Sequence, residues 1–198
     1  MFEKLESGWT NMTQTAKLTA TNASVTSNFG FSVSISGNTV VVGDPDQAVG
    51  GKQNQGAAYV FVKPTRGWRD MTQTAELTVP YGKADDSLIP STRWRSRNPT
   101  PDNLGWSVYI SGHSVVVGAP GHNHGAGAAY LFLKPAGGWK PTSKFDASFT
   151  TNGGKRGDAL GQSECTTGST LLMGAYLATV SGNSHQGAAY IFQPSRGR

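Results

Sequence analysis

The chain has 198 residues, a formal net charge of +5 at pH 7 and 26 glycines that recur at fixed positions. Its single cysteine, Cys165, excludes an intramolecular disulfide, and no apolar run approaches the roughly 20 residues of a membrane-spanning helix. The basic residues are scattered except at 93–97, and this distribution argues against nucleic acid as the partner. We expect Cys165 to be a packed, inert thiol, because it falls in a predicted strand among small residues.

The first part of the chain contains four short segments with the alternation typical of β-strands. In segment 29–37, Val33 and Ile35 point to one side and the intervening serines to the other. Glycine and asparagine at 37–38 fit a tight hairpin turn, since both residues tolerate positive φ. No segment has the spacing of an amphipathic helix. In chain order, the four predicted strands fall within residues 14–19, 29–37, 39–45 and 56–61.

The same order of strands recurs twice further along the chain. A Gly-Trp pair precedes each round, with spacings of 59 and 71 residues. The most regular segment, Gly-Ala-Ala-Tyr-x-Phe, occupies residues 56–61, 127–132 and 187–192. Repeats of this length hold several strands each, and an array of four-stranded sheets is the architecture of a β-propeller.

These repeats resemble the FG-GAP repeats of integrin α-subunit-type β-propellers. The resemblance rests on Phe-Gly at 29–30, on Gly-Ala-Pro at 118–120 and on the three Gly-Ala-Ala-Tyr segments, and it covers nearly the whole chain. It implies propeller blades, of which the family ring has seven and this chain supplies three.

Calcium-binding members of the family carry an Asp-rich loop between the Phe-Gly strand and the Gly-Ala-Pro strand. In this chain only two residues stand at that connection, at 37–38, 112–113 and 168–169. A calcium cage takes six or more oxygens from a loop of several residues. We therefore expect no calcium at the family positions and assign no cofactor.

We predict an all-β fold, a single propeller array over residues 1–198 with three four-stranded antiparallel sheets. The blades span approximately 29–79, 104–150 and 160–193. The third has no fourth strand of its own, and residues 9–19 match the missing outer strand. Closing three blades alone would fall outside the usual four to eight.

Strand exchange between copies would close the ring. Two copies that donate their amino-terminal strands to each other make a six-bladed homodimer without open sheet edges, and we favour this homo-oligomer. The alternatives are a piece of a longer propeller and a larger ring. The amino terminus lacks the apolar core of a signal peptide. The family resemblance implies an extracellular or cell-surface protein, so the compartment stays open.

The second unit carries one large departure from the repeat. From the apolar residue of the outer strand to the family glycine the distance is 12 residues in two units and 28 in the second, which leaves an insertion at about 81–103. Loops of this length are usually functional or disordered. The insertion contains cationic and aromatic candidates for ligand binding: Arg93, Trp94, Arg95 and Arg97.

Strands of a blade run alternately up and down, so the insertion shares a face with the loops that follow the second strand of each blade. Those loops supply the other ligand-binding candidates: Asp44, Asp46, His122, Asn123, His124 and His185. Polar loops beside a tryptophan and three arginines favour an acidic sugar, a phosphate-bearing partner or an acidic protein. The alternative without ligand binding is that these are solvated turn residues and that the insertion packs between two copies.

Two functions of different class fit this face. The first is a non-enzymatic, lectin-like recognition module that binds a glycan or protein ligand. The second is an enzyme acting on a carbohydrate or small metabolite with His122, His124 or His185 as acid or base, which no Ser-His-Asp signature supports. His122 and His124 could also reach one metal ion, completed by His185 and Asp44. Structural zinc takes four ligands and no cysteine is nearby, so we assign no metal site.

Overall fold

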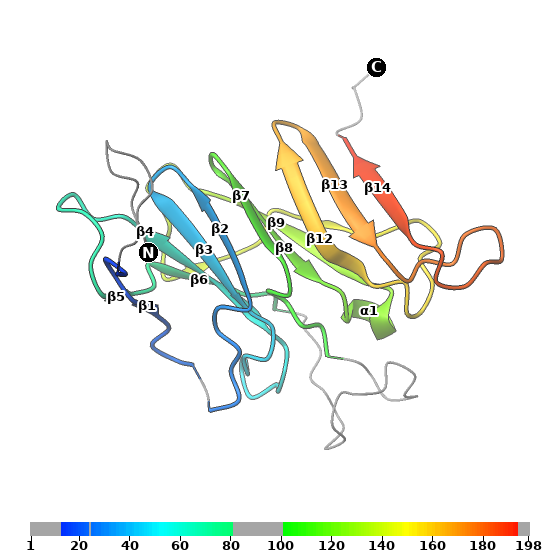
Figure 1. The fold of residues 1–198 in the computed structure, drawn as a ribbon, viewed down its shortest axis with the longest axis horizontal. Helices are drawn as coiled ribbons and strands as arrows, with labels where there is room; N and C mark the ends of the chain where they lie inside the picture. The colour runs from blue at the N-terminus through cyan, green and yellow to red at the C-terminus, as the bar shows by residue number, and fades with distance from the viewer. Residues whose placement is uncertain (1–12, 24, 81–100, 194–198) are drawn as a thin grey trace.

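The computed structural model describes residues 13–23, 25–80 and 101–193. Figure 1 shows three twisted sheets standing side by side along the long axis of the molecule, one for each repeat. The one helix in the described part, α1 (His122–Gly125), has four residues, and no described helix is long and apolar enough to cross a membrane. The chain is therefore all-β, as the sequence predicts.

The first sheet has the up-and-down strand order of a propeller blade. Its strands are β2 (Ser32–Ser36), β3 (Thr39–Asp44), β4 (Ala57–Val62) and β6 (Ala75–Leu77), each antiparallel to the next. β3 is buried along its whole length because it lies inside the sheet and is covered on both faces. Short strand β10 (Thr142–Ser143) extends the outer edge in parallel with β6 and so links the first sheet to the second repeat.

The second sheet repeats this arrangement. It contains β7 (Val108–Ser111), β8 (Ser114–Ala119), β9 (Ala128–Leu133) and β11 (Ala147–Phe149), all antiparallel. The Gly-Ala-Ala-Tyr strand β9 pairs with the valine-rich β8 in the same register as β4 with β3. The repeat in the sequence is thus a repeat in hydrogen-bond register.

The third sheet has three strands. These are β12 (Leu160–Thr167), β13 (Thr170–Ala175) and β14 (Ala188–Phe192), in that order. Among the described residues no strand lies on the outer side of β14, so the fourth position is open. Cys165 on β12 is exposed, which corrects our expectation of a packed thiol. Its partner in the ladder is Leu172, whose neighbours Leu171 and Met173 pack toward the second sheet, so Cys165 lies on the other face, which no described sheet covers.

The amino-terminal segment lies beside the first sheet. β1 (Leu18–Thr19) pairs in parallel with β5 (Met71–Thr72). Figure 1 shows β1 and β14 at opposite ends of the array. The segment therefore does not complete the third sheet of its own chain, and the described sheets do not form a closed ring.

Apolar side chains fill the spaces between neighbouring sheets. Between the first and second sheets, the buried cluster includes Val41, Val60 and Leu77 from one side and Val117 and Phe132 from the other. A similar cluster joins the second sheet to the third. Each such side chain contributes about 1.5–3 kcal/mol when buried. Contacts between sheets, rather than any single sheet, therefore hold the array together.

Candidate binding face

The strands are joined by different kinds of connection at their two ends. At one end, the first two strands of each sheet are joined by tight two-residue turns, such as 37–38 and 112–113. At the other end, the connections are longer and differ between repeats: residues 45–56, 120–127 and 176–187. We call this second side, together with the segments that enter the first strand of each sheet, the loop face. Figure 1 shows α1 on it, away from the β2–β3 and β12–β13 turns.

Backbone strain is concentrated on the loop face. All of the described non-glycine residues with positive φ belong to it: Asn54, Asn103, Asn123, His124, Ala159, Ser181 and His185. On the opposite side, positive φ occurs only at glycines of the described turns. Such conformations cost about 1–3 kcal/mol each and persist where the surroundings enforce them, most often at functional sites. The backbone of the loop face is therefore held by its surroundings at these seven positions.

His122 lies on this face, in the connection between β8 and β9, and contacts a buried carboxylate. Its Nδ1 is 3.2 Å from Oδ1 of Asp102, whose side chain is fully buried in the segment before β7. The hydroxyl of Tyr130 on β9 lies 3.4 Å from the same Nδ1. Burial, and secondarily the charge of Asp102, raises the pKa of the Tyr130 hydroxyl. With Nδ1 turned toward Asp102, Nε2 of the partly exposed His122 is the ring nitrogen left for a further partner.

The segment after the insertion is fastened to the first repeat. The Asn103 side-chain amide donates to the carbonyl oxygen of Pro45 at 3.2 Å and to Asp46 Oδ1 at 3.4 Å. The Leu104 amide donates to the carbonyl oxygen of Gln55 at 3.0 Å. Hydrogen bonds therefore join the loops of the first and second repeats on this face.

Comparison with known families agrees with the strand order. The model of the FG-GAP repeat matches residues 12–61 and 99–132. Two segments of the chain, in its first and second repeats, are therefore similar to the FG-GAP repeat. No curated protein matches it. The third repeat lies outside the matched residues, yet β13 and β14 pair in the register of the other two. FG-GAP repeats are generally ligand-binding or protein-interaction modules.

Asp44 has a structural role in the first repeat. Its carboxylate is fully buried and accepts hydrogen bonds from the Ser27 hydroxyl and, at 2.9 Å, from the Asn28 amide. Desolvation raises its pKa, although these hydrogen bonds oppose the shift. Our expectation that Asp44 faces a ligand does not fit this burial. It instead holds the entry to β2, while the half-buried Asp46 accepts from Asn28 and Asn103.

The other predicted site residues do not form one cluster among the described residues. Asn123 is exposed and His124 is half-buried beside it, with an Nδ1 that has no hydrogen-bond partner among the described residues. His185 is exposed on the β13–β14 loop of the next repeat. Within the described ranges, no three His, Cys, Asp or Glu side chains form a group that could hold a metal ion. The candidates Arg93, Trp94, Arg95 and Arg97 lie outside the described residues.

Sequence reasoning missed Asp102 and Tyr130, although the repeat contains a signal for the first. An aspartate stands two residues before the Leu-Gly pair in the second and third repeats, at Asp102 and Asp158. Asp158 accepts from the backbone amides of Lys155 at 2.8 Å and Thr179 at 3.3 Å. This aspartate therefore fastens the loop face in both repeats, and in the second it also positions a histidine.

Proposed function

We propose that the chain is a non-enzymatic recognition module that binds a protein ligand through its loop face. The observation that carries this proposal is the restriction of strained non-glycine backbone to that face. The loops there vary between repeats, whereas the two-residue turns on the other side do not. Variable, conformationally fixed loops on a regular scaffold are the usual location of recognition.

A protein ligand fits the spread of the polar groups. Exposed Asn123 and His185 come from different repeats, and Asp102 orients the neighbouring His122. A cavity of about 330 Å³ lies between the second and third sheets, away from these groups, and its lining is mainly apolar. A broad, polar surface with preset side chains suits a protein partner better than a small enclosed substrate.

The same experiment also tests two alternative hypotheses, a glycan ligand and an enzymatic activity. The cationic and aromatic residues at 93–97 favour an acidic glycan, which would make the module lectin-like. The His122–Asp102 pair has the arrangement of a general base and its orienting carboxylate, which favours the enzymatic alternative. We further propose that the module acts as a homodimer in which the loop faces of two copies form one ring.

A binding selection with matched variants tests the proposal. The purified chain is used to select binders from a displayed library of protein domains and is applied in parallel to a glycan array. Asn123→Ala combined with His185→Ala alters the loop face, and His113→Ala alters an exposed turn on the opposite side. We expect selected proteins to lose at least about tenfold in affinity for the loop-face variant, equivalent to ~1.4 kcal/mol, and to bind His113→Ala unchanged.

Each other outcome is informative. Binders that tolerate the loop-face substitutions but not His113→Ala would overturn the assignment of the face. A specific glycan signal lost with Trp94→Ala and Arg95→Ala would replace the protein ligand by a glycan. Turnover of a small substrate that disappears with His122→Gln would establish the enzyme.

A further inference from the structure

The first sheet exposes apolar side chains that are buried at the same repeat positions elsewhere. Residues 30–37 of the first repeat align with 105–112 of the second. Val33 on β2 is 67% exposed, whereas its counterpart Val108 on β7 is 9% exposed and packs against the first sheet. Ile35 is exposed in the same way. One end of the array thus presents half of a sheet–sheet contact.

The third sheet presents the other half. Leu172 on β13 and Ile191 on β14 are exposed, the latter by 68%. Their counterparts in the first sheet, Val41 and Val60, have no exposed surface because the second sheet covers them. The surface that receives Val108 inside the array is therefore repeated, uncovered, at its far end.

A polar contact repeats across each junction between sheets. The Ser32 hydroxyl donates to the carbonyl oxygen of Gly105 at 2.8 Å. The Ser107 hydroxyl donates to the carbonyl oxygen of Gly161 at the same distance, 2.8 Å. Each serine at the start of a first strand thus donates to the glycine that precedes or begins the first strand of the next sheet.

At the two ends of the array, one serine and one glycine of this repeated contact have no partner sheet among the described residues. Ser163 on β12 is the next donor and Gly30 before β2 is the matching glycine, and both are exposed. A Cβ added to Gly43 or Gly118 would lie 2.0 Å or 2.1 Å from the incoming glycine carbonyl. At Gly174, the equivalent glycine of the third sheet, the nearest atom is the Ser163 Oγ at 2.6 Å, and the place of the carbonyl is empty.

The amino-terminal segment is a copy of a fourth strand. Residues 12–19 repeat residues 71–78 with one difference, Lys17 in place of Glu76. The later segment contains β6, whose preceding residue Thr74 donates its amide to the carbonyl oxygen of Val60 at 2.7 Å. Thr15 holds the position of Thr74 in the amino-terminal copy.

In this chain the segment packs on the outer side of the first sheet. That is the place of a fourth strand belonging to a further blade, which another copy would supply. Ala16 is buried against the outer side of the first sheet, with Phe61 and Trp68 in the same cluster. β1 pairs with β5 in parallel, as β6 pairs with β10 at the next junction. The missing parts of that preceding blade are three inner strands, and the third sheet of another copy has three strands.

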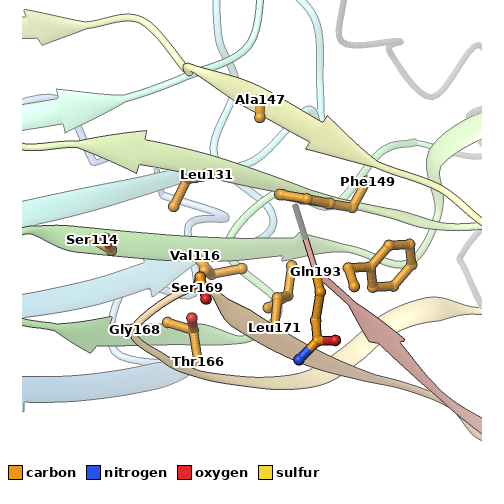
Figure 2. Close-up of a pocket in the computed structure, with 11 residues that line it drawn as sticks. Ser114, Val116, Leu131, Ala147, Phe149, Thr166, Gly168, Ser169, Leu171 and Gln193 are labelled. Atoms are coloured by element: carbon orange, nitrogen blue, oxygen red, sulfur yellow. The ribbon is translucent and has the colours of Figure 1, made fainter. Parts of the chain in front are cut away.

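A tryptophan fills the junction between the first and second sheets. Trp139 is buried in the cluster that contains Ala75 and Leu77 from the fourth strand of the first sheet and Phe132 from the second. The corresponding place between the second and third sheets is the cavity of about 330 Å³. Its lining includes the equivalent residues Ala147, Phe149 and Phe192. Figure 2 shows side chains of both sheets surrounding it.

Trp9 has the sequence position of the missing tryptophan. It stands seven residues before Ala16, as Trp68 stands seven residues before Ala75. If residues 12–19 of another copy form the fourth strand of the third sheet, its Trp9 is carried to the cavity. The open edge, the uncovered apolar surface and the cavity are then filled by one docking event.

We propose that a second copy docks head-to-tail on the third sheet, with its residues 9–19 as the fourth strand and its Trp9 in the cavity. Val33 and Ile35 of the second copy cover Leu172 and Ile191. The reciprocal contact closes a six-bladed ring with no open sheet edge. This interface supplies contacts for the proposed homodimer and rests on that part of the proposed function, but it requires no ligand.

Cys165 provides a built-in reporter for this interface. It holds the position of Ser34, whose hydroxyl accepts from the Ile110 amide at 3.1 Å across the first junction. The second copy therefore covers Cys165, which is exposed in the single chain. Light scattering gives the mass of the assembly, and a maleimide measures access to the thiol.

The experiment compares the wild-type chain with an end-face variant, Val33→Arg combined with Ile35→Arg, and with His113→Arg in an exposed turn of the middle sheet. We expect wild type and His113→Arg to have twice the 20.9 kDa chain mass. The end-face variant should be a monomer whose thiol reacts at least about tenfold faster. Circular dichroism confirms that it is folded, since both replaced side chains are exposed in the single chain.

A monomeric wild-type chain at ~100 μM would overturn the proposal, because closed oligomers bury their edges at far lower concentrations. So would a dimer in which Cys165 reacts as fast as in the variant, or an assembly larger than two copies. These measurements use no ligand, so a failed binding selection leaves them unaffected.

Discussion

The Gly-Ala-Ala-Tyr strand has nearly the same sequence in the first and third repeats but a different environment in each. β4 is buried except at its last residue, whereas exposed positions alternate with half-buried ones along β14. β4 lies beside β6 and is covered on both faces, while β14 has no described strand on its outer side. Burial in this array is therefore set by the neighbours of a strand rather than by its own residues.

The largest effect should come from equivalent phenylalanines of the two sheets. Phe61 is fully buried, so Phe61→Ala should lower the free energy of unfolding by about 3–5 kcal/mol. Phe192 is half-buried, so Phe192→Ala should cost less than half as much in the monomeric Val33→Arg/Ile35→Arg background. Urea unfolding measures both. Equal costs in that background would contradict the difference, whereas in the wild-type dimer the two costs should approach each other.

Two equivalent glycines give the next effect. A Cβ at Gly118 would lie 2.1 Å from the backbone carbonyl oxygen of Gly161, so Gly118→Ala should destabilise the chain by about 1–3 kcal/mol through overpacking. At Gly174 the nearest atom belongs to the Ser163 side chain, which can rotate away. Gly174→Ala should change monomer stability by less than about 0.5 kcal/mol but weaken the dimer. Thermal unfolding and light scattering separate the two quantities, and a Gly174→Ala dimer of unchanged affinity would contradict the docking.

The strand order could be predicted from the sequence because the repeat is regular in just those residues that set register. The alternation around Val33 and the Gly-Ala-Ala-Tyr segments are local signals. The exposure of individual side chains was less predictable. Cys165 looked like a core residue because its strand neighbours are small, but exposure depends on a sheet that the chain itself does not place there.

The candidate site was only partly predictable for a similar reason. His122 and Asn123 stand out in a loop, but Asp102 lies 20 residues earlier, on the far side of two strands, and nothing local pairs it with His122. Asp44 looked like a surface loop residue, yet Ser27 and Asn28 hold its carboxylate inside the fold. Contacts between loops depend on how the sheets stack, which the alternation of a single strand does not encode.

The two junctions between sheets also differ at one equivalent position, where the second has a glutamate and the first a valine. Glu164 on β12 holds the position of Val108, and its Oε2 lies within hydrogen-bond distance of the Ser107 hydroxyl oxygen. Its Oε1 is buried without a described hydrogen-bond partner. Burial raises the pKa of Glu164 to about 8, although hydrogen bonds from Ser107 and the Gly118 backbone lower it. The second junction should therefore respond to pH, unlike the apolar first one.

The folded chain keeps this proton above the ordinary pKa of 4.5, so its stability should fall as pH rises from about 4.5 to about 8 and then level off. Glu164→Gln should remove this slope and raise the free energy of unfolding above pH 8 by an amount on the order of 2 kcal/mol. Urea unfolding at pH 5, 7 and 9 tests the expectation. Glu76→Gln controls for the loss of one carboxylate. An unchanged slope in Glu164→Gln would assign the pH dependence elsewhere.

The smallest effect should arise at the equivalent aspartates of the second and third repeats, Asp102 and Asp158, which have different hydrogen-bond partners. Asp158 is satisfied by backbone amides, but Asp102 also contacts His122. His122→Ala removes one partner of a buried carboxylate and should lower the free energy of unfolding by about 1 kcal/mol. His113→Ala, in an exposed turn, should change it by less than about 0.5 kcal/mol. Because His122 lies far from both end faces in the repeat order, neither variant should alter the dimer mass. A loss of dimer with His122→Ala alone would mean that the loop face and the docking surface are coupled.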